Sequence, residues 1–312
     1  MIKVGIIGGA GYTAGELIRI LIHHPESELT FVHSESHSGE KLSNVHRDLE
    51  GDSDLLFTNS IDKVDVVFLC AGHGKSKEIL ATHNLKNLNI IDLSADYRLD
   101  DSFSYGLPEL NEQYKNKIAN PGCFATAIQL ALLPLSEKQL LKNEVHVHAI
   151  TGSTGAGQSL SPTTHFSWRT GNVSIYKAFE HQHLNEIHKT LESKQNDKIS
   201  INFIPVRGPF TRGIFASAYT DCDLKIEQLD DLYNSYYDGA TFTNVSATSI
   251  DLKQVVNTNK CLIHLEKHGS KVLITSAIDN LLKGASGQAV QNMNIMFGMD
   301  QKTGLQLKSN YF

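Results

Sequence analysis

Short apolar runs alternate with helical stretches in the first third of the chain. Lys3–Ile7 is apolar and β-branched, and a glycine cluster separates it from Glu16–His24, where apolar residues recur at helical spacing. By the same criteria, further strands bounded by turn or polar residues are predicted at Leu29–His33, Val64–Cys70 and Leu88–Leu93. This alternation of strands and helices predicts an α/β domain with a doubly wound parallel sheet.

The middle of the chain has a different rhythm, because strands follow one another with few long helices between them. We predict these strands at Val145–Ile150, Ile199–Val206, Gly213–Thr220, Cys261–Glu266 and Val272–Ala277. Only Lys267–Lys271 joins the last two, as expected for a hairpin. The pattern predicts a second domain of α+β class, with a mixed or antiparallel sheet, that starts near Asn120. Helical spacing returns in Leu281–Phe297, and we expect this segment to pack back on the first domain.

The composition is that of a folded globular protein. The 312 residues, with 40% hydrophobic and 20% charged residues, are enough for two domains. A net charge of −6 with scattered Lys and Arg gives no general attraction to nucleic acid or to an anionic membrane. The N-terminus enters a strand at once, and no apolar stretch approaches the roughly 18 residues of a membrane span. These features favour a cytoplasmic protein.

A glycine-rich loop follows the first strand and opens a helix. Within it, Gly9-x-Gly11-x-x-Ala14 matches the dinucleotide fingerprint G-x-G-x-x-G/A, whose glycines let backbone N–H groups approach a pyrophosphate. The alternative is a plain glycine-rich connection, but the position after the first strand favours binding in a Rossmann-type domain. The cofactor contacts predicted here are Gly8, Gly9, Gly11, Tyr12 and Thr13.

The second strand ends at Ser34 and Glu35, which we also expect to contact the cofactor. An acidic residue about twenty positions after the glycine loop commonly binds the ribose hydroxyls of NAD, whereas Arg favours the 2′-phosphate of NADP. Glu35 therefore favours NAD. The alternative is a solvated loop carboxylate.

One cysteine stands at a sharp turn into an apolar helix. Asn120-Pro121-Gly122 precedes Cys123, and an apolar helical run follows it and ends at Pro134. The unpaired N–H groups and the dipole of the first helical turn stabilise a thiolate. A thiolate is the nucleophile that attack on an acyl phosphate or an aldehyde requires. The alternative is a buried structural thiol.

The other three cysteines suit such a nucleophile less well. Cys70 and Cys261 lie inside apolar strands and are interpreted as structural, and Cys222 lies between two Asp residues that disfavour its thiolate. All four are far apart in sequence and form no CxxC pair. We therefore expect reduced thiols, without a disulfide framework or a zinc knuckle.

Eight sequence blocks carry a resemblance to a known family. They are Gly-Gly-Ala-Gly-Tyr-Thr-Ala-Gly-Glu-Leu (8–17), Leu-Ser-Ala-Asp-Tyr-Arg-Leu (93–99), Tyr-Gly-Leu-Pro-Glu-Leu (105–110), Asn-Pro-Gly-Cys (120–123), Gly-Ser-Thr-Gly-Ala-Gly (152–157), His-Gln-His (181–183), Arg-Gly-Ile (212–214) and Ile-Asp-Asn-Leu-Leu-Lys-Gly-Ala-Ser-Gly-Gln-Ala-Val-Gln-Asn-Met-Asn (278–294). Together they resemble the N-acetyl-gamma-glutamyl-phosphate reductase family, within the wider glyceraldehyde-3-phosphate and aspartate-semialdehyde dehydrogenase-like group. The likeness covers nearly the whole chain.

The resemblance implies a cytoplasmic oxidoreductase of arginine biosynthesis. It would reduce N-acetyl-gamma-glutamyl phosphate with NADPH to the semialdehyde, through a thioester on Cys123. Residues 1–120 would form the dinucleotide-binding domain, completed by a C-terminal helix at about 281–312. Residues 121–280 would form the catalytic and oligomerisation domain of a homo-oligomer, a dimer or tetramer.

The resemblance also assigns roles to residues. The general acid/base falls on His181, because a neutral imidazole can take the thiol proton and return a proton to the developing aldehyde oxygen. From the sequence alone, the His-x-His pair could equally be a solvated helix start or two metal ligands. No third ligand has convincing spacing, so we predict no metal site. Substrate contacts are implied for Arg98, Tyr176, His183 and Arg212, and further cofactor contacts for Gly155, Gly157 and Asn280.

Alternatives remain for several of these residues. Arg98 alone would be interpreted as a surface ion pair with Asp96 or Asp100, and Tyr176 as ordinary packing. Glycine loops and Asn turns such as that at Asn280 also occur for backbone reasons alone.

The chain departs from the family pattern at two informative places. Where many members carry Ser-Arg after the second strand, this chain has Ser-Glu, so NAD is the alternative to NADP. Gln158 stands where Arg is common, which leaves Arg169, Arg207 or Arg212 as alternative anion contacts. The alternative functions are the same chemistry on an N-succinyl-glutamyl, aspartyl or aminoadipyl phosphate, and a non-catalytic NAD(P)-sensing protein.

Overall fold

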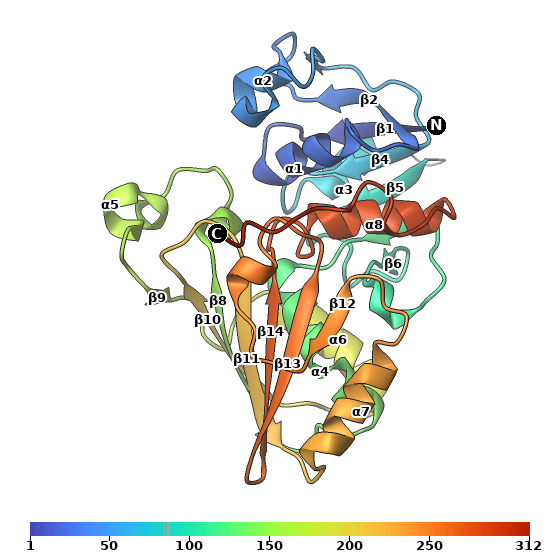
Figure 1. The fold of residues 1–312 in the computed structure, drawn as a ribbon. Helices are drawn as coiled ribbons and strands as arrows, with labels where there is room; N and C mark the ends of the chain where they lie inside the picture. The colour runs from blue at the N-terminus through green and yellow to red at the C-terminus, as the bar shows by residue number, and fades with distance from the viewer. Residues whose placement is uncertain (84, 86–87) are drawn as a thin grey trace. The chain divides into compact units, whose positions relative to one another are not determined.

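The computed structural model describes residues 1–83, 85 and 88–312. The chain forms two compact units, each with its own sheet (Figure 1). Unit 1 consists of Met1–Gly122 and Ala285–Gln306, and unit 2 of Cys123–Gly284 and Leu307–Phe312. Each unit is therefore built from two separate stretches of the chain.

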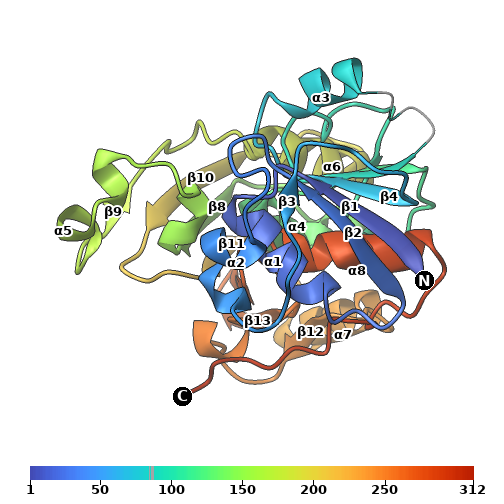
Figure 2. The same ribbon diagram turned by 90° about the horizontal axis from the view of Figure 1, so that it is seen from above.

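Unit 1 contains a sheet in the order β3-β2-β1-β4-β5-β7-β6, in which every strand pair is parallel. Its strands are β1 (Ile2–Ile7), β2 (Ser27–His33), β3 (Phe57–Thr58), β4 (Val66–Leu69), β5 (Asn89–Asp92), β6 (Ser104–Tyr105) and β7 (Lys117–Ala119). The strand order reverses between β1 and β4, which lie side by side in Figure 2. In sheets of this class, ligands bind outside the carboxyl ends of the strands at this switch point.

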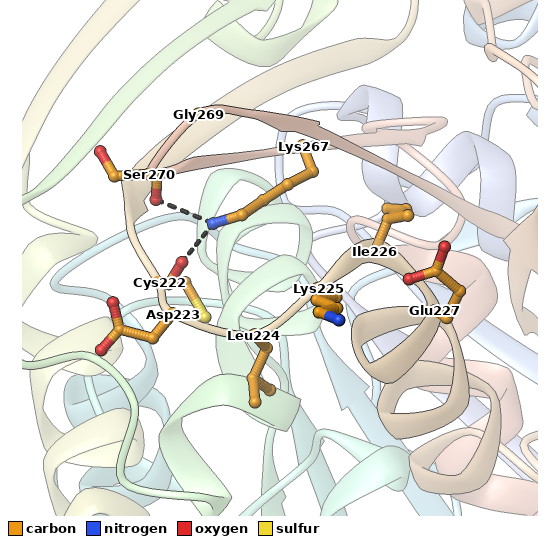
Figure 3. Close-up of a pocket in the computed structure, with 9 residues that line it drawn as sticks. All are labelled: Cys222, Asp223, Leu224, Lys225, Ile226, Glu227, Lys267, Gly269 and Ser270. Carbon is orange, nitrogen blue, oxygen red and sulfur yellow. Dashed lines mark hydrogen bonds between the residues drawn. The ribbon is translucent and has the colours of Figure 1, made fainter.

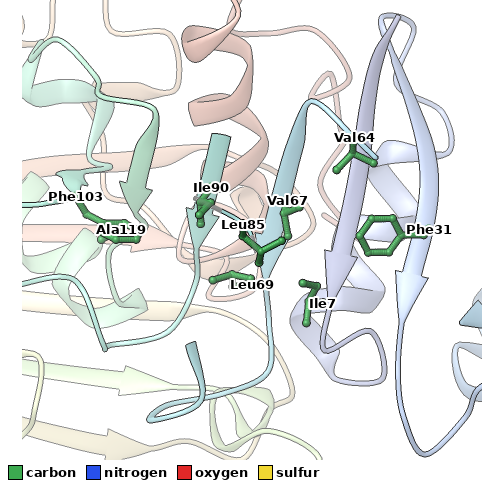
Figure 4. Packing of buried hydrophobic residues seen from close by; sticks show 9 residues of the cluster. All are labelled: Ile7, Phe31, Val64, Val67, Leu69, Leu85, Ile90, Phe103 and Ala119. Atoms are coloured by element: carbon green, nitrogen blue, oxygen red, sulfur yellow. The ribbon is translucent and has the colours of Figure 1, made fainter. Parts of the chain in front are cut away.

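Helices and apolar side chains bury the sheet of unit 1. Every residue of β4 is buried, as expected for a parallel strand covered on both faces. The surrounding cluster, drawn in Figure 4, consists of Ile7, Phe31, Val64, Val67, Leu69, Leu85, Ile90, Phe103 and Ala119. The helical elements of the unit are α1 (Tyr12–Leu21), α2 (Leu42–Val45), η1 (Arg47–Leu49), α3 (Ser76–Thr82), η2 (Pro108–Leu110) and α8 (Ser286–Met296).

Polar contacts hold helix α8 within unit 1. The Ser286 hydroxyl donates to the Thr13 carbonyl at 2.8 Å, which links α8 to α1. The Asn292 side-chain amide donates to the Gly106 carbonyl at 2.9 Å and to Asn120 Oδ1 at 3.0 Å. These bonds explain how a helix rich in amide side chains can be almost fully buried.

Unit 2 contains a mixed sheet in the order β12-β13-β14-β11-β8-β10-β9 (Figure 1). Its strands are β8 (Val145–Thr151), β9 (Ser174–Ile175), β10 (Ile201–Arg207), β11 (Ile214–Asp221), β12 (Thr243–Ser246), β13 (Cys261–His268) and β14 (Lys271–Ile278). The β10–β8 and β12–β13 pairs are parallel, and the other pairs are antiparallel. Gly269 and Ser270 join β13 to β14, and Gly269 adopts the left-handed backbone that this short turn requires.

The helices of unit 2 gather around one nearly fully buried helix. Its helical elements are α4 (Cys123–Glu137), η3 (Ser153–Ala156), η4 (Pro162–Thr164), α5 (Phe166–Arg169), α6 (Leu184–Gln195), α7 (Ile226–Tyr236) and η5 (Leu252–Gln254). Helix α4 contacts α6, α7 and the central strands β11 and β14. This position explains why the residues after Cys123 are apolar around the whole helix rather than along one stripe.

The predicted fold class is confirmed: a parallel doubly wound sheet in unit 1 and a mixed sheet in unit 2. The bounds of three predicted helices are wrong. Helix α1 begins at Tyr12, directly after the glycine loop, and ends at Leu21, whereas the spacing predicted Glu16–His24. In the C-terminal segment the helix begins only at Ser286, because the Asp279 carboxylate accepts the amides of Leu281 and Leu282 in a preceding turn.

Helix α4 is the third case, since it continues through Pro134 to Glu137. Proline has no N–H to donate to the carbonyl of Leu130. The Tyr237 hydroxyl donates to this carbonyl, and the Tyr233 hydroxyl donates to the next one, Ala131, at 2.7 Å. Tertiary hydrogen bonds therefore offset the local cost that led us to expect the helix to end.

Candidate active site

The glycine loop of unit 1 fits a dinucleotide pyrophosphate. Gly8 has φ +87°, and a Cβ there would lie 2.5 Å from the Ala71 backbone nitrogen, so only glycine suits this turn. At Gly11, by contrast, a Cβ would meet nothing within 4 Å, which leaves open space beside the first turn of α1. No side chain caps this helix and no acidic residue lies in its first turn. The N–H groups of this turn, which includes Tyr12 and Thr13, can therefore bind an anion.

At the end of β2, Ser34 is buried and Glu35 is exposed. The amide of Ser34 donates to the Thr58 carbonyl at 3.0 Å, which fixes the start of this loop beside β3. A solvent-exposed carboxylate at Glu35 can accept hydrogen bonds from ribose hydroxyls and would repel a 2′-phosphate.

Arg98 is a buried residue of unit 1, not the surface side chain that an ion pair with Asp96 or Asp100 would need. Its Nε donates to the Asn120 carbonyl at 3.0 Å, and Nη2 donates to the Leu93 carbonyl at 3.3 Å. The guanidinium therefore ties the segment before Cys123 to the loop after β5, and its predicted role in substrate binding stays a prediction.

Cys123 is the first residue of α4 and is half-buried. A glycine packs directly against it: a Cβ on Gly284 would lie 2.8 Å from the Cys123 Cβ and 2.7 Å from the Asn280 carbonyl oxygen. This close approach explains why the turn after Asn280 contains glycine. Since helix N-termini favour anions, the position of the sulfur suits a thiolate.

His181 lies in an aromatic enclosure beside the start of α4. Its ring centroid lies 5.3 Å from that of Phe124, 5.5 Å from that of Phe203 and 4.6 Å from that of His183. His181 is only 4% exposed, and burial, with a smaller contribution from Lys177, lowers its pKa to about 4.

The hydrogen bonding of His181 also favours the neutral ring. Its Nδ1 accepts the backbone N–H of His183 at 3.2 Å, so Nδ1 carries no proton. In a neutral imidazole the proton then resides on Nε2, which becomes a hydrogen-bond donor. His183 itself precedes α6 and contacts the rings of both Phe124 and His181.

Tyr176 connects the histidine to a pair of arginines. Its ring lies 5.7 Å from that of His181, and the Arg207 guanidinium lies 4.0 Å above the Tyr176 ring centroid. Burial raises the pKa of the Tyr176 hydroxyl, and the Cys123 sulfur raises it further, whereas Arg207 and Arg169 act in the opposite direction. Cys123, His181, Tyr176 and the two arginines thus form one cluster within unit 2.

The remaining predicted contacts form a second group in unit 2, around Asn280. Asn280 Oδ1 accepts the Gly213 amide at 2.7 Å, and its Nδ2 donates to the Thr154 hydroxyl at 3.0 Å. This fixes the loop that contains Gly155 and Gly157, of which Gly157 has φ +75°. The direct cofactor contacts predicted for Asn280 and these glycines stay predictions.

Arg212 belongs to the same group and is held by a carboxylate. Its Nε and Nη2 donate to the two oxygens of the fully buried Asp279 at 3.0 and 3.1 Å. Asp279 also accepts the Asn257 amide at 2.7 Å. Two of the donor atoms of Arg212 therefore position a loop, which makes this residue less suited to substrate binding than the prediction assumed.

A surface pocket of about 430 Å³ lies elsewhere in unit 2, between the β11–α7 loop and the β13–β14 turn (Figure 3). It is lined in part by Cys222 and Lys267, but the Lys267 ammonium already donates to the carbonyls of Cys222 and Ser270.

Among the residues that the structure describes, no group of three His, Cys, Asp or Glu side chains could hold a metal ion. None of the helices formed by the described residues is long and apolar enough to cross a membrane.

Several residues of these groups had no predicted role. Gly284, Asp279 and Thr154 lie inside or beside the recognised sequence blocks, but nothing in their spacing indicates contacts with Cys123, Arg212 or Asn280. Arg169 and Arg207 were considered only as replacements for a missing arginine. The signal for Arg207 is its position at the end of a strand, where site residues commonly lie.

Two family models match the two halves of the chain. Residues 3–118 match the semialdehyde dehydrogenase NAD binding domain. Residues 123–280 match the semialdehyde dehydrogenase dimerisation domain. Together the models cover most of the chain.

Relatives and solved structures agree with these matches. The chain is 59% identical to N-acetyl-gamma-glutamyl-phosphate reductase from Christiangramia forsetii and 55% identical to that from Bacteroides thetaiotaomicron, over 100% of each chain. Its fold is similar to aspartate semialdehyde dehydrogenase II from Vibrio cholerae, with TM-score 0.72 and 18% identity over 96% of this chain and 99% of that one. A structure of aspartate semialdehyde dehydrogenase with NADP from Candida albicans gives TM-score 0.71 and 12% identity, over 95% and 99% of the two chains. The chain therefore belongs to the semialdehyde dehydrogenase family and, within it, to the N-acetyl-gamma-glutamyl-phosphate reductases.

Proposed function

We propose that this chain reduces N-acetyl-gamma-glutamyl phosphate to N-acetyl-glutamate semialdehyde and inorganic phosphate, as a step of arginine biosynthesis. The single observation that carries the proposal is the cluster of Cys123, His181 and Tyr176 at the N-terminus of α4. The shared name of relatives at 55–59% identity over the full length supports the same substrate. A nucleotide sensor would need neither a thiol nor a buried imidazole at this place.

In the first step, the Cys123 thiolate attacks the acyl carbon of the substrate. A carbon–sulfur bond forms, the bond from carbon to the phosphate oxygen breaks, and inorganic phosphate leaves with the electron pair of that bond. The first turn of α4 stabilises the thiolate before attack through its unpaired N–H groups. The product of this step is a thioester on Cys123.

In the second step, the thioester becomes an aldehyde. The reduced nicotinamide cofactor, when bound, supplies the hydride to the thioester carbon. We assign to His181 Nε2–H the hydrogen bond to the oxygen that becomes negative, because Nδ1 is used by the His183 amide. In this tautomer His181 has no free basic nitrogen, so we do not assign to it the uptake of the thiol proton that the resemblance implied. When the tetrahedral species collapses, the carbon–sulfur bond breaks and Cys123 leaves as a thiolate.

Unit 1 is the part of the chain that we propose to bind the cofactor, and unit 2 the part that performs the chemistry and forms the oligomer. The dinucleotide phosphates would bind the loop that contains Gly8, Gly9 and Gly11. Self-association is supported by the sheet of unit 2, where Phe215 and Leu262 are only partly buried and Tyr219 is exposed. Burial of such a face against a second copy would remove apolar area from water.

The reductant that we propose is NADPH, with NADH as the alternative that Glu35 favours. Initial rates with both cofactors would decide between them. Because the Glu35 carboxylate would repel a 2′-phosphate, Glu35→Arg should raise the NADPH/NADH ratio of kcat/KM by about tenfold or more. A wild-type protein that prefers NADH by a large factor would contradict the NADPH proposal but not the reaction.

The reaction itself is tested with the purified chain, N-acetyl-glutamate semialdehyde, phosphate and oxidised cofactor. Cys123→Ser should lower turnover by about a thousandfold or more while cofactor binding persists. Cys222→Ser is the matched control, because Cys222 is a buried thiol outside the cluster, and it should retain near-normal turnover. Near-normal activity of Cys123→Ser would exclude the thioester mechanism, and better turnover of another semialdehyde would exclude the substrate.

A further inference from the structure

Arg169, at the end of α5, is a buried cation without a hydrogen-bond partner among the residues that the structure describes. The residue is 8% exposed, and its Nε, Nη1 and Nη2 atoms are all buried and unpartnered. A guanidinium carries five N–H donors, and leaving them unsatisfied away from water is costly. A hydrogen-bond acceptor bound at this place would offset that cost.

The neighbours of Arg169 do not supply the missing negative charge. Burial and the positive charge of Arg207 both lower the pKa of Arg169, and only Tyr176 acts in the opposite direction. Tyr176 cannot balance the charge, because its own pKa is raised and its hydroxyl stays neutral. Two guanidinium groups therefore share this part of unit 2 without a carboxylate among the groups that shift the pKa of Arg169.

A second polar group without a partner lies beside Arg207. Strand β9 pairs with β10 so that Ser174 lies opposite Arg207, and the buried Ser174 hydroxyl has no hydrogen-bond partner among the described residues. Tyr176 lies two residues further along and stacks under Arg207. The unpartnered donors of Arg169 and Ser174 therefore lie near the Arg207–Tyr176 pair, and Tyr176 is near enough to Cys123 for the sulfur to raise the pKa of its hydroxyl.

We propose that Arg169, together with Arg207 and the Ser174 hydroxyl, forms a subsite that binds an anionic oxygen group of the substrate beside Cys123. The inference rests on the proposed function and assigns a substrate-binding role to residues outside the recognised sequence blocks. Two groups of the substrate have the required chemistry, the phosphate and the α-carboxylate. Both accept bidentate hydrogen bonds from a guanidinium.

The other arginines considered for this role are engaged elsewhere. The fork of Arg212 holds the Asp279 carboxylate, and Arg98 donates to two backbone carbonyls in unit 1. Arg169 is the one among them whose three side-chain nitrogens are all buried and unpartnered in the described part of the chain.

Steady-state kinetics in the oxidative direction separates the two sources, because phosphate and semialdehyde are then independent reactants. Arg169→Met should raise the KM of one of them by about tenfold to a hundredfold, the usual cost of losing a charged hydrogen bond. A rise confined to phosphate identifies the phosphate subsite, and a rise confined to the semialdehyde identifies the carboxylate subsite. Arg169→Lys should recover part of the loss, and Lys260→Met, which removes an exposed cation of the same unit, should change neither constant.

An unchanged KM for both reactants in Arg169→Met would overturn the subsite. If this variant were in addition a monomer while the wild type is an oligomer, Arg169 would be assigned to a carboxylate of a second copy. Native mass measurements on both proteins distinguish this case.

A direct binding measurement tests the subsite independently of the proposed function. Trp168, the only tryptophan of the chain, precedes Arg169 and reports on its surroundings by fluorescence. Inorganic phosphate or N-acetylglutamate should change the emission of the wild type in a saturable way, and Arg169→Met should abolish the change. Absence of turnover with saturable binding would refute the function and retain the subsite, whereas turnover without any such binding would count against the subsite.

Discussion

The buried position of His181 makes the stability of unit 2 depend on pH. A histidine that is neutral in the fold but titrates normally in the unfolded chain binds fewer protons when folded. Stability therefore falls as pH decreases from the ordinary pKa of 6.5 toward the folded pKa of about 4. Because His181 is only 4% exposed, solvent screening does not reduce this effect much.

The magnitude follows from the two pKa values. With 6.5 in the unfolded chain and about 4 in the fold, His181 alone lowers the free energy of unfolding by about 2 kcal/mol between about pH 7.5 and about pH 5. His181→Asn removes the titrating ring but offers an oxygen in place of Nδ1 to the His183 amide. Between the same two pH values, the free energy of unfolding of the variant should therefore fall by about 2 kcal/mol less than that of the wild type.

Urea denaturation followed by Trp168 fluorescence measures this difference, because the only tryptophan lies in unit 2. His148→Asn is the control: His148 is exposed on β8 of the same unit, so its loss should leave the pH dependence unchanged. The comparison is a difference between two pH values, so any constant packing cost of either substitution cancels. Equal losses of stability in wild type and His181→Asn would refute the assignment of a neutral, buried imidazole.

Further predictions concern the loops around the site. Asp279→Asn should destabilise unit 2 by about 2–4 kcal/mol in urea denaturation, because it leaves the Arg212 guanidinium without its anion; an effect below about 0.5 kcal/mol would contradict this. Gly284→Ala should slow turnover and reaction with iodoacetamide, since its Cβ would lie 2.8 Å from the Cys123 Cβ; unchanged rates would show that the contact is not limiting. Gly8→Ala should lower stability by about 1–3 kcal/mol because of its positive φ, whereas Gly11→Ala should keep stability and raise the cofactor KM. Equal stability of these two variants would refute the distinction.

Much of the fold could be predicted from local pattern. Strands such as β4 and β8 were recognisable because parallel strands covered on both faces are continuously apolar and half-buried strands alternate. The glycine loop and the turn before Cys123 were recognisable because their backbone geometry requires particular residue types at fixed spacing. In both cases the physical cause lies within about ten neighbouring residues.

The errors arose where hydrogen bonds from side chains, rather than the spacing of apolar residues, decide where a helix begins or ends. Helix α4 continues past Pro134 because Tyr237, a hundred positions later, donates to the carbonyl that proline leaves without its amide. The Leu281–Phe297 segment has helical spacing throughout, but Asp279 holds its first residues in a turn. Neither set of hydrogen bonds can be recognised from the spacing of apolar residues in the helix that it changes.

The arginines show the same principle for function. Arg98 and Arg212 lie inside recognised blocks and Arg169 and Arg207 outside them, but the sequence does not decide which of the four binds an anionic group of the substrate. They differ in the group that each guanidinium contacts. Arg98 donates to two backbone carbonyls, Arg212 donates to a buried carboxylate, and Arg207 lies over an aromatic ring. A buried cation must be neutralised by some group, and the fold provides one for Arg212 but not for Arg169. The residue with unmet hydrogen-bonding capacity is therefore the better candidate for the substrate, and only the tertiary structure can reveal which residue that is.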